Sequence, residues 1–132
     1  MREVILVVDD EAFVLNIVSS ILDNAGFTVF RASSATQALD IGKQYGGPIR
    51  LLLSDVIMPG LSGPCLADLF TVIHPETDCM FMAGLPDSPE ICERILSRGI
   101  PFLPKPFFPR TLVSKVNEVL GGSPLGGTVG AF

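Results

Sequence analysis

Three short apolar runs in this chain end abruptly in charged residues, and this arrangement restricts the possible folds. The runs are Val4–Val8, Leu51–Ser54 and Ile100–Pro104, and the charged residues after them are Asp9-Asp10-Glu11, Asp55 and Lys105. Apolar runs of about four to eight residues are typical of strands buried on both faces of a parallel sheet. Because ligands of open parallel sheets bind at the carboxyl ends of the strands, we expect these charges to converge at one edge. Carboxylates gathered there hold a cation or repel one another, which favours metal and phosphoryl chemistry.

The rest of the chain alternates between strand and helix patterns, which predicts five βα units in a three-layer α/β sandwich. The expected strands are 4–8, 27–30, 49–54, 79–83 and 100–103, and helices are expected to begin near residues 12, 35, 63, 89 and 109. The residues spaced as buried helix faces are Phe13, Ile17, Ile21 and Leu22 in the first helix, and Leu66, Leu69, Phe70 and Ile73 in the third. In a doubly wound sheet of order 2-1-3-4-5 the first and third strands are neighbours, so their terminal carboxylates can lie within a few ångströms.

Composition excludes several function classes. The net charge is −5 and no basic stripe is present, so we expect no direct contact with nucleic acid. No apolar stretch reaches the roughly 18 residues of a membrane span, and the first residues lack a signal peptide pattern, so we expect a cytoplasmic protein without membrane insertion. Three cysteines without metal or CxxC spacing, Cys65, Cys79 and Cys92, are interpreted as buried, reduced thiols. We expect residues 1–120 to form one domain and the glycine-rich segment 121–132 to be a flexible tail.

The residue types at the predicted edge suit one kind of chemistry. Carboxylate oxygens without histidine or cysteine nearby are ligands that suit Mg²⁺. A carboxylate beside Mg²⁺ can attack phosphorus and form an aspartyl phosphate, and Asp55 is placed for this role. Lys105, at the end of the fifth strand, can supply a compact positive charge to the phosphoryl group.

Each of these residues also has an ordinary structural interpretation. Asp9 and Asp10 could cap the first helix and place favourable negative charge at its first turn. Asp55 could be a turn residue, and Lys105 could be a solvated lysine in a proline-rich loop. Phe102 could simply belong to the core.

Three segments in order resemble the receiver domain of bacterial two-component response regulators. They are VVDDE at residues 7–11, SDVIMPGLSG at 54–63 and FLPKPF at 102–107, with separations of 45 and 50 residues between Asp10, Asp55 and Lys105. The resemblance covers residues 2–120 and extends to receivers of hybrid sensor kinases as well as to single-domain regulators. It implies a flavodoxin-like fold and a phosphoacceptor role in signal transduction. It also implies a protein that is not an enzyme, beyond assisting its own phosphorylation and dephosphorylation.

The resemblance assigns roles residue by residue. Asp55 would be the phosphoacceptor, while Asp9, Asp10, Asp55 and the backbone carbonyl of Ile57 would bind Mg²⁺, Asp9 mostly through water. Lys105 would contact the phosphoryl group, and its bond to Pro106 would be a cis peptide. Phe102 occupies the position of the switch aromatic. Ala83 stands where the family usually has Thr or Ser, so it could offer the phosphoryl group only its backbone.

The resemblance also implies partners. A histidine kinase or a His phosphotransfer protein would donate the phosphoryl group. Output would reach another protein through the face made by the fourth helix, the fifth strand and the fifth helix, which would include Ile91, Arg94, Phe102 and Phe107. The protein would be a monomer or a weak dimer.

Two other function classes remain open from the residues. A pseudo-receiver, which binds partners without being phosphorylated, is favoured by Ala83 and disfavoured by the intact acidic cluster. A small aspartyl-phosphate phosphohydrolase would need a second aspartate where Ile57 stands. A flavodoxin-like cofactor protein would need a phosphate-binding loop where residues 9–11 are acidic.

Overall fold

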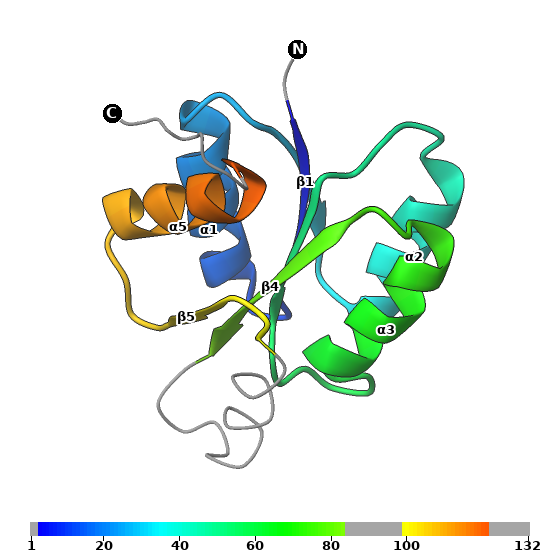
Figure 1. Cartoon of the computed structure of the whole chain (residues 1–132). Helices are drawn as coiled ribbons and strands as arrows, with labels where there is room; N and C mark the ends of the chain where they lie inside the picture. The colour runs from blue at the N-terminus through cyan, green and yellow to red at the C-terminus, as the bar shows by residue number, and fades with distance from the viewer. Residues whose placement is uncertain (1–2, 84–98, 122–132) are drawn as a thin grey trace.

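A parallel sheet of five strands forms the centre of the molecule (Figure 1). The computed structural model describes residues 3–83 and 99–121. The strands are β1 (Val4–Val8), β2 (Thr28–Ala32), β3 (Leu51–Asp55), β4 (Asp78–Ala83) and β5 (Phe102–Pro104). Their order is β2-β1-β3-β4-β5 and every neighbouring pair is parallel, so the predicted topology is confirmed.

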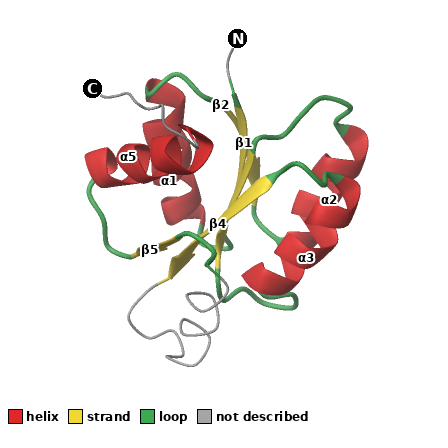
Figure 2. Ribbon diagram, viewed as in Figure 1, coloured by secondary structure: helices red, strands yellow, loops and turns green. Residues whose placement is uncertain are grey.

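Helices cover both faces of this sheet and complete three layers (Figure 2). They are α1 (Ala12–Asn24), α2 (Ala35–Gln44), α3 (Gly63–Ile73) and α5 (Pro109–Gly121). The pair α1 and α5 lies on one face of the sheet, and the pair α2 and α3 lies on the other. The predicted fourth helix and residues 122–132 of the predicted tail fall outside the described residues, and the first residue of that tail, Gly121, is the last residue of α5. Among the described residues, no helix is long and apolar enough to cross a membrane.

The local sequence explains where several helices begin and end. The hydroxyl of Ser34 accepts a hydrogen bond from the Gln37 amide at 3.1 Å and caps α2, and Ser62 caps α3 in the same way. Helix α1 ends at Asn24, Ala25 is its C-cap residue, and Gly26 follows with a positive φ of 102°, a conformation that glycine adopts without strain. The starts of α2 and α3 agree with the helices expected to begin near residues 35 and 63.

The sheet divides the hydrophobic core into two clusters. One lies between the sheet and α2 and α3 and contains Leu6, Leu52, Phe70 and Phe81. The other lies between the sheet and α1 and α5 and contains Val7, Leu22, Leu53 and Leu112. Because side chains alternate along a strand, neighbouring residues of β1 and β3 supply opposite clusters. This two-sided burial explains why these strands are apolar throughout.

The predicted buried face of α1 is wrong in part. Phe13 is 77% exposed and Ile17 is 43% exposed, whereas Leu15 and Val18 are buried together with Leu22. Both sets have helical spacing, so periodicity alone cannot decide which of them faces the sheet. The same ambiguity affects α3, where Leu69, predicted to be buried, is 47% exposed.

Helices α2 and α3 approach each other closely at a glycine. A Cβ atom on Gly42 would lie 2.7 Å from Cε1 of Phe70. The buried ring of His74 stacks on Phe70, and its Nε2 donates to the Gly42 carbonyl at 2.7 Å. That carbonyl is one of the last four of α2, which lack partners within their own helix. His74 therefore has a structural role at the contact between α2 and α3.

Candidate functional site

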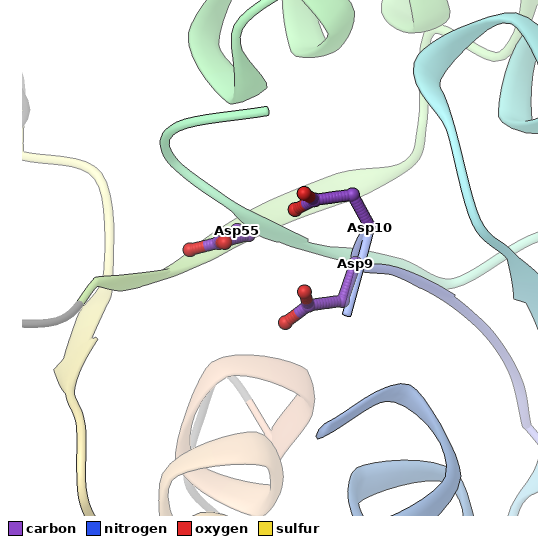
Figure 3. A group of neighbouring side chains, drawn as sticks. All are labelled: Asp9, Asp10 and Asp55. Atoms are coloured by element: carbon purple, nitrogen blue, oxygen red, sulfur yellow. The ribbon is translucent and has the colours of Figure 1, made fainter. Parts of the chain in front are cut away.

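Three carboxylates meet at the carboxyl edge of the sheet, as the sequence predicts. Asp9 and Asp10 follow β1, and Asp55 is the last residue of the neighbouring β3. One carboxylate oxygen from each residue lies within 4.8 Å of the others. Figure 3 shows all three side chains extending toward the same side of this edge. Since Asp9 and Asp55 are buried, their mutual repulsion is only weakly screened by solvent.

The helix-cap interpretation of Asp9 and Asp10 is not supported by the geometry. The N-cap residue of α1 is Glu11, and it makes no side-chain capping bond. The Asp9 side chain instead accepts a hydrogen bond from the Glu11 amide at 2.9 Å, a local turn in which Oδ1 is held close to its own backbone. Asp9 is fully buried, so it needs a charged or hydrogen-bonding partner for its second oxygen as well.

Lys105 supplies that partner and joins the acidic residues. Its Nζ lies 3.3 Å from Asp9 Oδ2 and 3.3 Å from Asp55 Oδ1. Partial burial opposes the charge of the ammonium group and lowers its pKa. The carboxylates of Asp55 and Asp9 outweigh that effect and raise the pKa of Lys105 above its ordinary value. Lys105 therefore stays charged at neutral pH, and it is not a solvated loop lysine.

The backbone around Asp55 is held on several sides. The Val56 amide lies 3.0 Å from Asp55 Oδ1 and 3.0 Å from the Met82 carbonyl of β4. The buried Ser54 hydroxyl donates to the Asp55 carbonyl at 2.8 Å. Sequence reasoning treated Ser54 as the end of a strand and Gly63 only as the start of a helix. Neither role can be read from the residue types, because both depend on how the loop between β3 and α3 returns Gly63 to Asp55.

The remaining predicted site residues lie close to the same edge. Ala83 ends β4 and is buried, and its carbonyl accepts a hydrogen bond from the Lys105 amide at 2.8 Å. Phe102 begins β5 opposite Phe81 and is half-buried against the core. The Ile57 side chain is exposed in the loop after Asp55. The Lys105–Pro106 bond is cis, the isomer that the resemblance implies.

The cysteine prediction requires a correction. Cys65 is exposed, because it lies in the first turn of α3 on the side away from the sheet. Cys79 is half-buried, and burial together with the nearby charges of Asp78 and Asp68 raises the pKa of its thiol to about 11. Cys79 is therefore an uncharged thiol at neutral pH, and Cys92 lies outside the described residues.

The arrangement as a whole suits a hard divalent cation. Its oxygen donors come from carboxylates at the ends of two adjacent strands, and the described residues bring no histidine or cysteine into the group. Among the described residues, one ammonium faces three carboxylates, so these four side chains together carry an excess of negative charge. A bound cation would relieve that excess.

Comparisons with known proteins place this chain among proteins of one family. Residues 5–117 match the family described as the response regulator receiver domain. The sensor kinase CckA of Brucella abortus is 34% identical over 123 residues, which are 89% of this chain and 12% of that protein. The response regulator receiver protein CpdR of the same organism is 29% identical, over 91% of this chain and 98% of that protein. The chain thus spans a small part of some relatives and nearly all of another.

Solved structures of receiver proteins have the same fold as this chain. The receiver domain of the hybrid histidine kinase CckA has a TM-score of 0.74 and 33% identity, over 89% of this chain and 98% of that one. The chemotaxis protein CheY4 of Vibrio cholerae has a TM-score of 0.79 and 27% identity, over 91% and 100%. The match of a family profile to most of the chain, the topology and the acidic edge lead to one conclusion: this chain belongs to the response regulator receiver domain family of two-component signal transduction.

Proposed function

We propose that this receiver accepts a phosphoryl group on Asp55 in a reaction that requires Mg²⁺. The observation that carries the proposal is the position of Asp55, which lies between two further carboxylates and the ammonium group of Lys105. An aspartate with only a structural role in a turn would not require two further carboxylates and an ammonium group beside it. The arrangement matches what phosphoryl transfer requires, a nucleophile with positive charge on either side of the transferred group.

The residues that would hold Mg²⁺ are the three aspartates and the backbone carbonyl of Ile57. Both oxygens of Asp9 already accept hydrogen bonds, from the Glu11 amide and from Lys105, so its contribution would pass through water. Asp10 is exposed and Asp55 borders the same space, so they would be the direct carboxylate ligands. When bound, Mg²⁺ supplies Lewis-acid neutralisation of the phosphoryl oxygens.

The transfer step is carried by the protein's own carboxylate. An oxygen of Asp55 forms a bond to phosphorus while the bond from phosphorus to the donor's imidazole nitrogen breaks, and the imidazole leaves with that electron pair. Lys105 moves its contact from the Asp55 carboxylate to a phosphoryl oxygen. The donor would be a histidine kinase or a His phosphotransfer protein, and the receiver only assists its own phosphorylation and dephosphorylation.

Exposed aromatic and aliphatic side chains lie on or beside the two helices that follow the acidic edge in the sequence. Phe13 and Ile17 lie on α1, which begins just after Asp10, and Phe108 lies at the start of α5, just after Lys105. Single exposed apolar groups are ordinary on protein surfaces, so what supports a contact site here is that Phe13 and Phe108 each lie three residues from a charged residue of the acidic edge. The partner that brings its phosphohistidine to Asp55 would cover these three residues.

The phosphorylation signal would be transmitted to another protein through the face made by the fourth helix, β5 and α5. Phe102 and Phe107 are half-buried there, and Ile91 and Arg94 lie outside the described residues. We infer a monomer or weak dimer that signals through protein contacts. Amide exchange with and without an acyl-phosphate mimic tests this, and changes confined to α1 and α2 would contradict it.

One observation favours a second function, the phosphorylation-independent pseudo-receiver. Ala83 has no hydroxyl to donate to a phosphoryl oxygen, so one of the usual contacts of a phosphorylated receiver is missing. Because Mg²⁺ and Lys105 would still neutralise the phosphoryl group, we infer that phosphorylation persists. The exposed apolar side chain of Ile57 offers no hydrogen bond to an attacking water, which favours slow hydrolysis.

The deciding experiment is phosphorylation by a small phosphodonor. With acetyl phosphate and Mg²⁺, intact mass spectrometry should show one added phosphoryl group, and Asp55→Asn should abolish it. Asp40→Asn, which removes the same charge from an exposed position on α2, is the matched control and should be labelled like the wild type. Labelling of Asp55→Asn to the wild-type level would refute the assignment, and absence of labelling in the wild type would favour the pseudo-receiver.

A further inference from the structure

Two residues enclose the backbone carbonyl of Asp55. From one side, the fully buried hydroxyl of Ser54 donates to the carbonyl oxygen at 2.8 Å. From the other side, the α-carbon of Gly63 packs against it so closely that a Cβ atom at this position would overlap the oxygen. The same Cβ atom would lie 3.1 Å from the α-carbon of Val56. Only glycine fits here without moving the backbone of the proposed phosphoacceptor.

The same contacts close the loop between β3 and α3. The amide of Gly63 donates to the Val56 carbonyl at 2.8 Å, which brings the beginning of α3 onto the end of β3. The loop between them contains Ile57, whose carbonyl is a proposed Mg²⁺ ligand. The position of Gly63 therefore affects both the conformation of the loop and the position of the Asp55 backbone.

The planarity of the peptide group connects this carbonyl to the reacting side chain. The Asp55 carbonyl and the Val56 amide belong to one peptide unit, which is rigid and flat. Fixing the carbonyl therefore fixes the direction of the amide hydrogen. That amide lies 3.0 Å from Oδ1 of Asp55, the oxygen that also lies 3.3 Å from Lys105 Nζ. The orientation of the carboxylate thus depends on how the carbonyl is held.

We propose that Ser54 and Gly63 are positioning residues for the reaction at Asp55, because together they lock its peptide plane and thereby aim its carboxylate. The inference rests on the proposed phosphoacceptor role of Asp55. Neither residue touches the transferred group, so both act through Asp55 and through the loop that carries Ile57. A misplacement of the reacting atoms by about 1 Å can slow a reaction by about a hundred-fold, so a small rotation of this peptide is sufficient.

The chain offers a matched control for Ser54. Ser19 on α1 is also fully buried, but its hydroxyl has no hydrogen-bond partner among the described residues and it lies on the opposite face of the sheet. Ser54→Ala should slow phosphorylation by acetyl phosphate at saturating Mg²⁺ by about ten-fold, while Ser19→Ala should stay within about two-fold of the wild type. Ser54→Thr, which keeps the hydroxyl, should restore most of the rate.

Gly63 has a matched control in Gly42. A Cβ atom would clash at both positions, but at Gly42 it would meet the ring of Phe70 between two helices, away from the acidic edge. Gly63→Ala should lower the phosphorylation rate constant by about a hundred-fold and weaken Mg²⁺ binding, measured by titration. Gly42→Ala should lower the melting temperature with little change in either quantity.

The outcomes separate this inference from the proposed function. If the wild type is phosphorylated on Asp55 but Ser54→Ala reacts as fast as Ser19→Ala, the positioning role is wrong and the proposed function stands. A slow Ser54→Thr variant with a wild-type melting temperature would also overturn it. If Gly63→Ala fails to fold, the serine series alone decides. A wild type that takes no phosphoryl group would overturn both the function and the inference.

Discussion

The two ends of the sheet carry polar clusters that differ in charge balance. At the amino end, the guanidinium group of Arg50 pairs with Glu3, with 2.6 Å between Nε and Oε2, and donates to the Leu120 carbonyl at 3.2 Å. At the carboxyl end, three carboxylates lie together, and two of them, Asp9 and Asp55, contact the ammonium group of Lys105. The first cluster is balanced and partly exposed, with side chains 37% and 45% exposed. The second has excess negative charge and two buried carboxylates, which is unfavourable unless another cation binds.

This difference separates a structural cluster from a functional one. Arg50 satisfies a carbonyl at the end of α5, where a cation also complements the helix dipole, and so it completes the fold. At the carboxyl end, the described side chains of Asp9, Asp10, Asp55 and Lys105 together carry more negative than positive charge. Such an arrangement is typical of a site that acts on a ligand.

The largest effect should follow from removing the shared cation. Lys105→Met should slow phosphorylation of Asp55 by about a hundred- to a thousand-fold, because it removes the positive charge that meets the phosphoryl oxygens. Lys115→Met, on the exposed side of α5 beside Glu118, is the control and should react like the wild type. Rates from a phosphate-release or mass-shift assay would measure both. Equal phosphorylation rates for the two variants would show that the charge of Lys105 is not needed for the reaction, which would contradict a functional role for the cluster at the carboxyl end.

Mg²⁺ should stabilise the fold through the carboxyl end only. At a concentration about a hundred times its dissociation constant, binding adds about 2.7 kcal/mol to the free energy of unfolding. Thermal melts at increasing Mg²⁺ should show this as a rising melting temperature. Asp10→Asn should stabilise the metal-free protein by reducing repulsion and should lose most of the response, whereas Glu3→Gln should keep it. A melting temperature that ignores millimolar Mg²⁺ would contradict the site.

Restoring a hydroxyl at Ala83 should have an intermediate effect. Ala83→Thr adds a donor for a phosphoryl oxygen, and a hydrogen bond to a charged group contributes about 1.5 kcal/mol at the lower end of its range. The phosphorylation-induced NMR shifts around Phe102 should grow in this variant. Ala83→Val, which has a similar shape without the hydroxyl, should leave them as they are. If the wild type already shows the full shift, the missing hydroxyl has no consequence.

The smallest effect belongs to the amino end. Arg50→Met should lower the free energy of unfolding by up to about 1 kcal/mol, because partly exposed ion pairs contribute little. Its phosphorylation rate and its Mg²⁺ response should match those of the wild type. Chemical denaturation combined with the mass-shift assay would measure both quantities. A slowed phosphorylation rate would show that the two ends are coupled.

The parts of the structure that follow from local sequence were predictable. Buried parallel strands fixed the topology, and because their ends meet at one edge the positions of Asp55 and Lys105 followed. The face of α1 was not predictable, because Phe13 and Leu15 both lie on apolar stripes and only the packing selects one of them. The enclosure of the Asp55 carbonyl could not be predicted either, since it depends on how the loop returns Gly63 to β3.

The split core has a consequence for engineering this protein. The two clusters lie on opposite faces of the same sheet, so their strand side chains point away from each other. Changes at sites that share no contacts combine additively. The cluster around Phe70 can therefore be redesigned independently of the cluster around Leu22. Stable variants of each cluster can be selected separately, because the strands between them present different side chains to the two faces. A library that varies one face at a time would sample sequences far more efficiently than one that varies both.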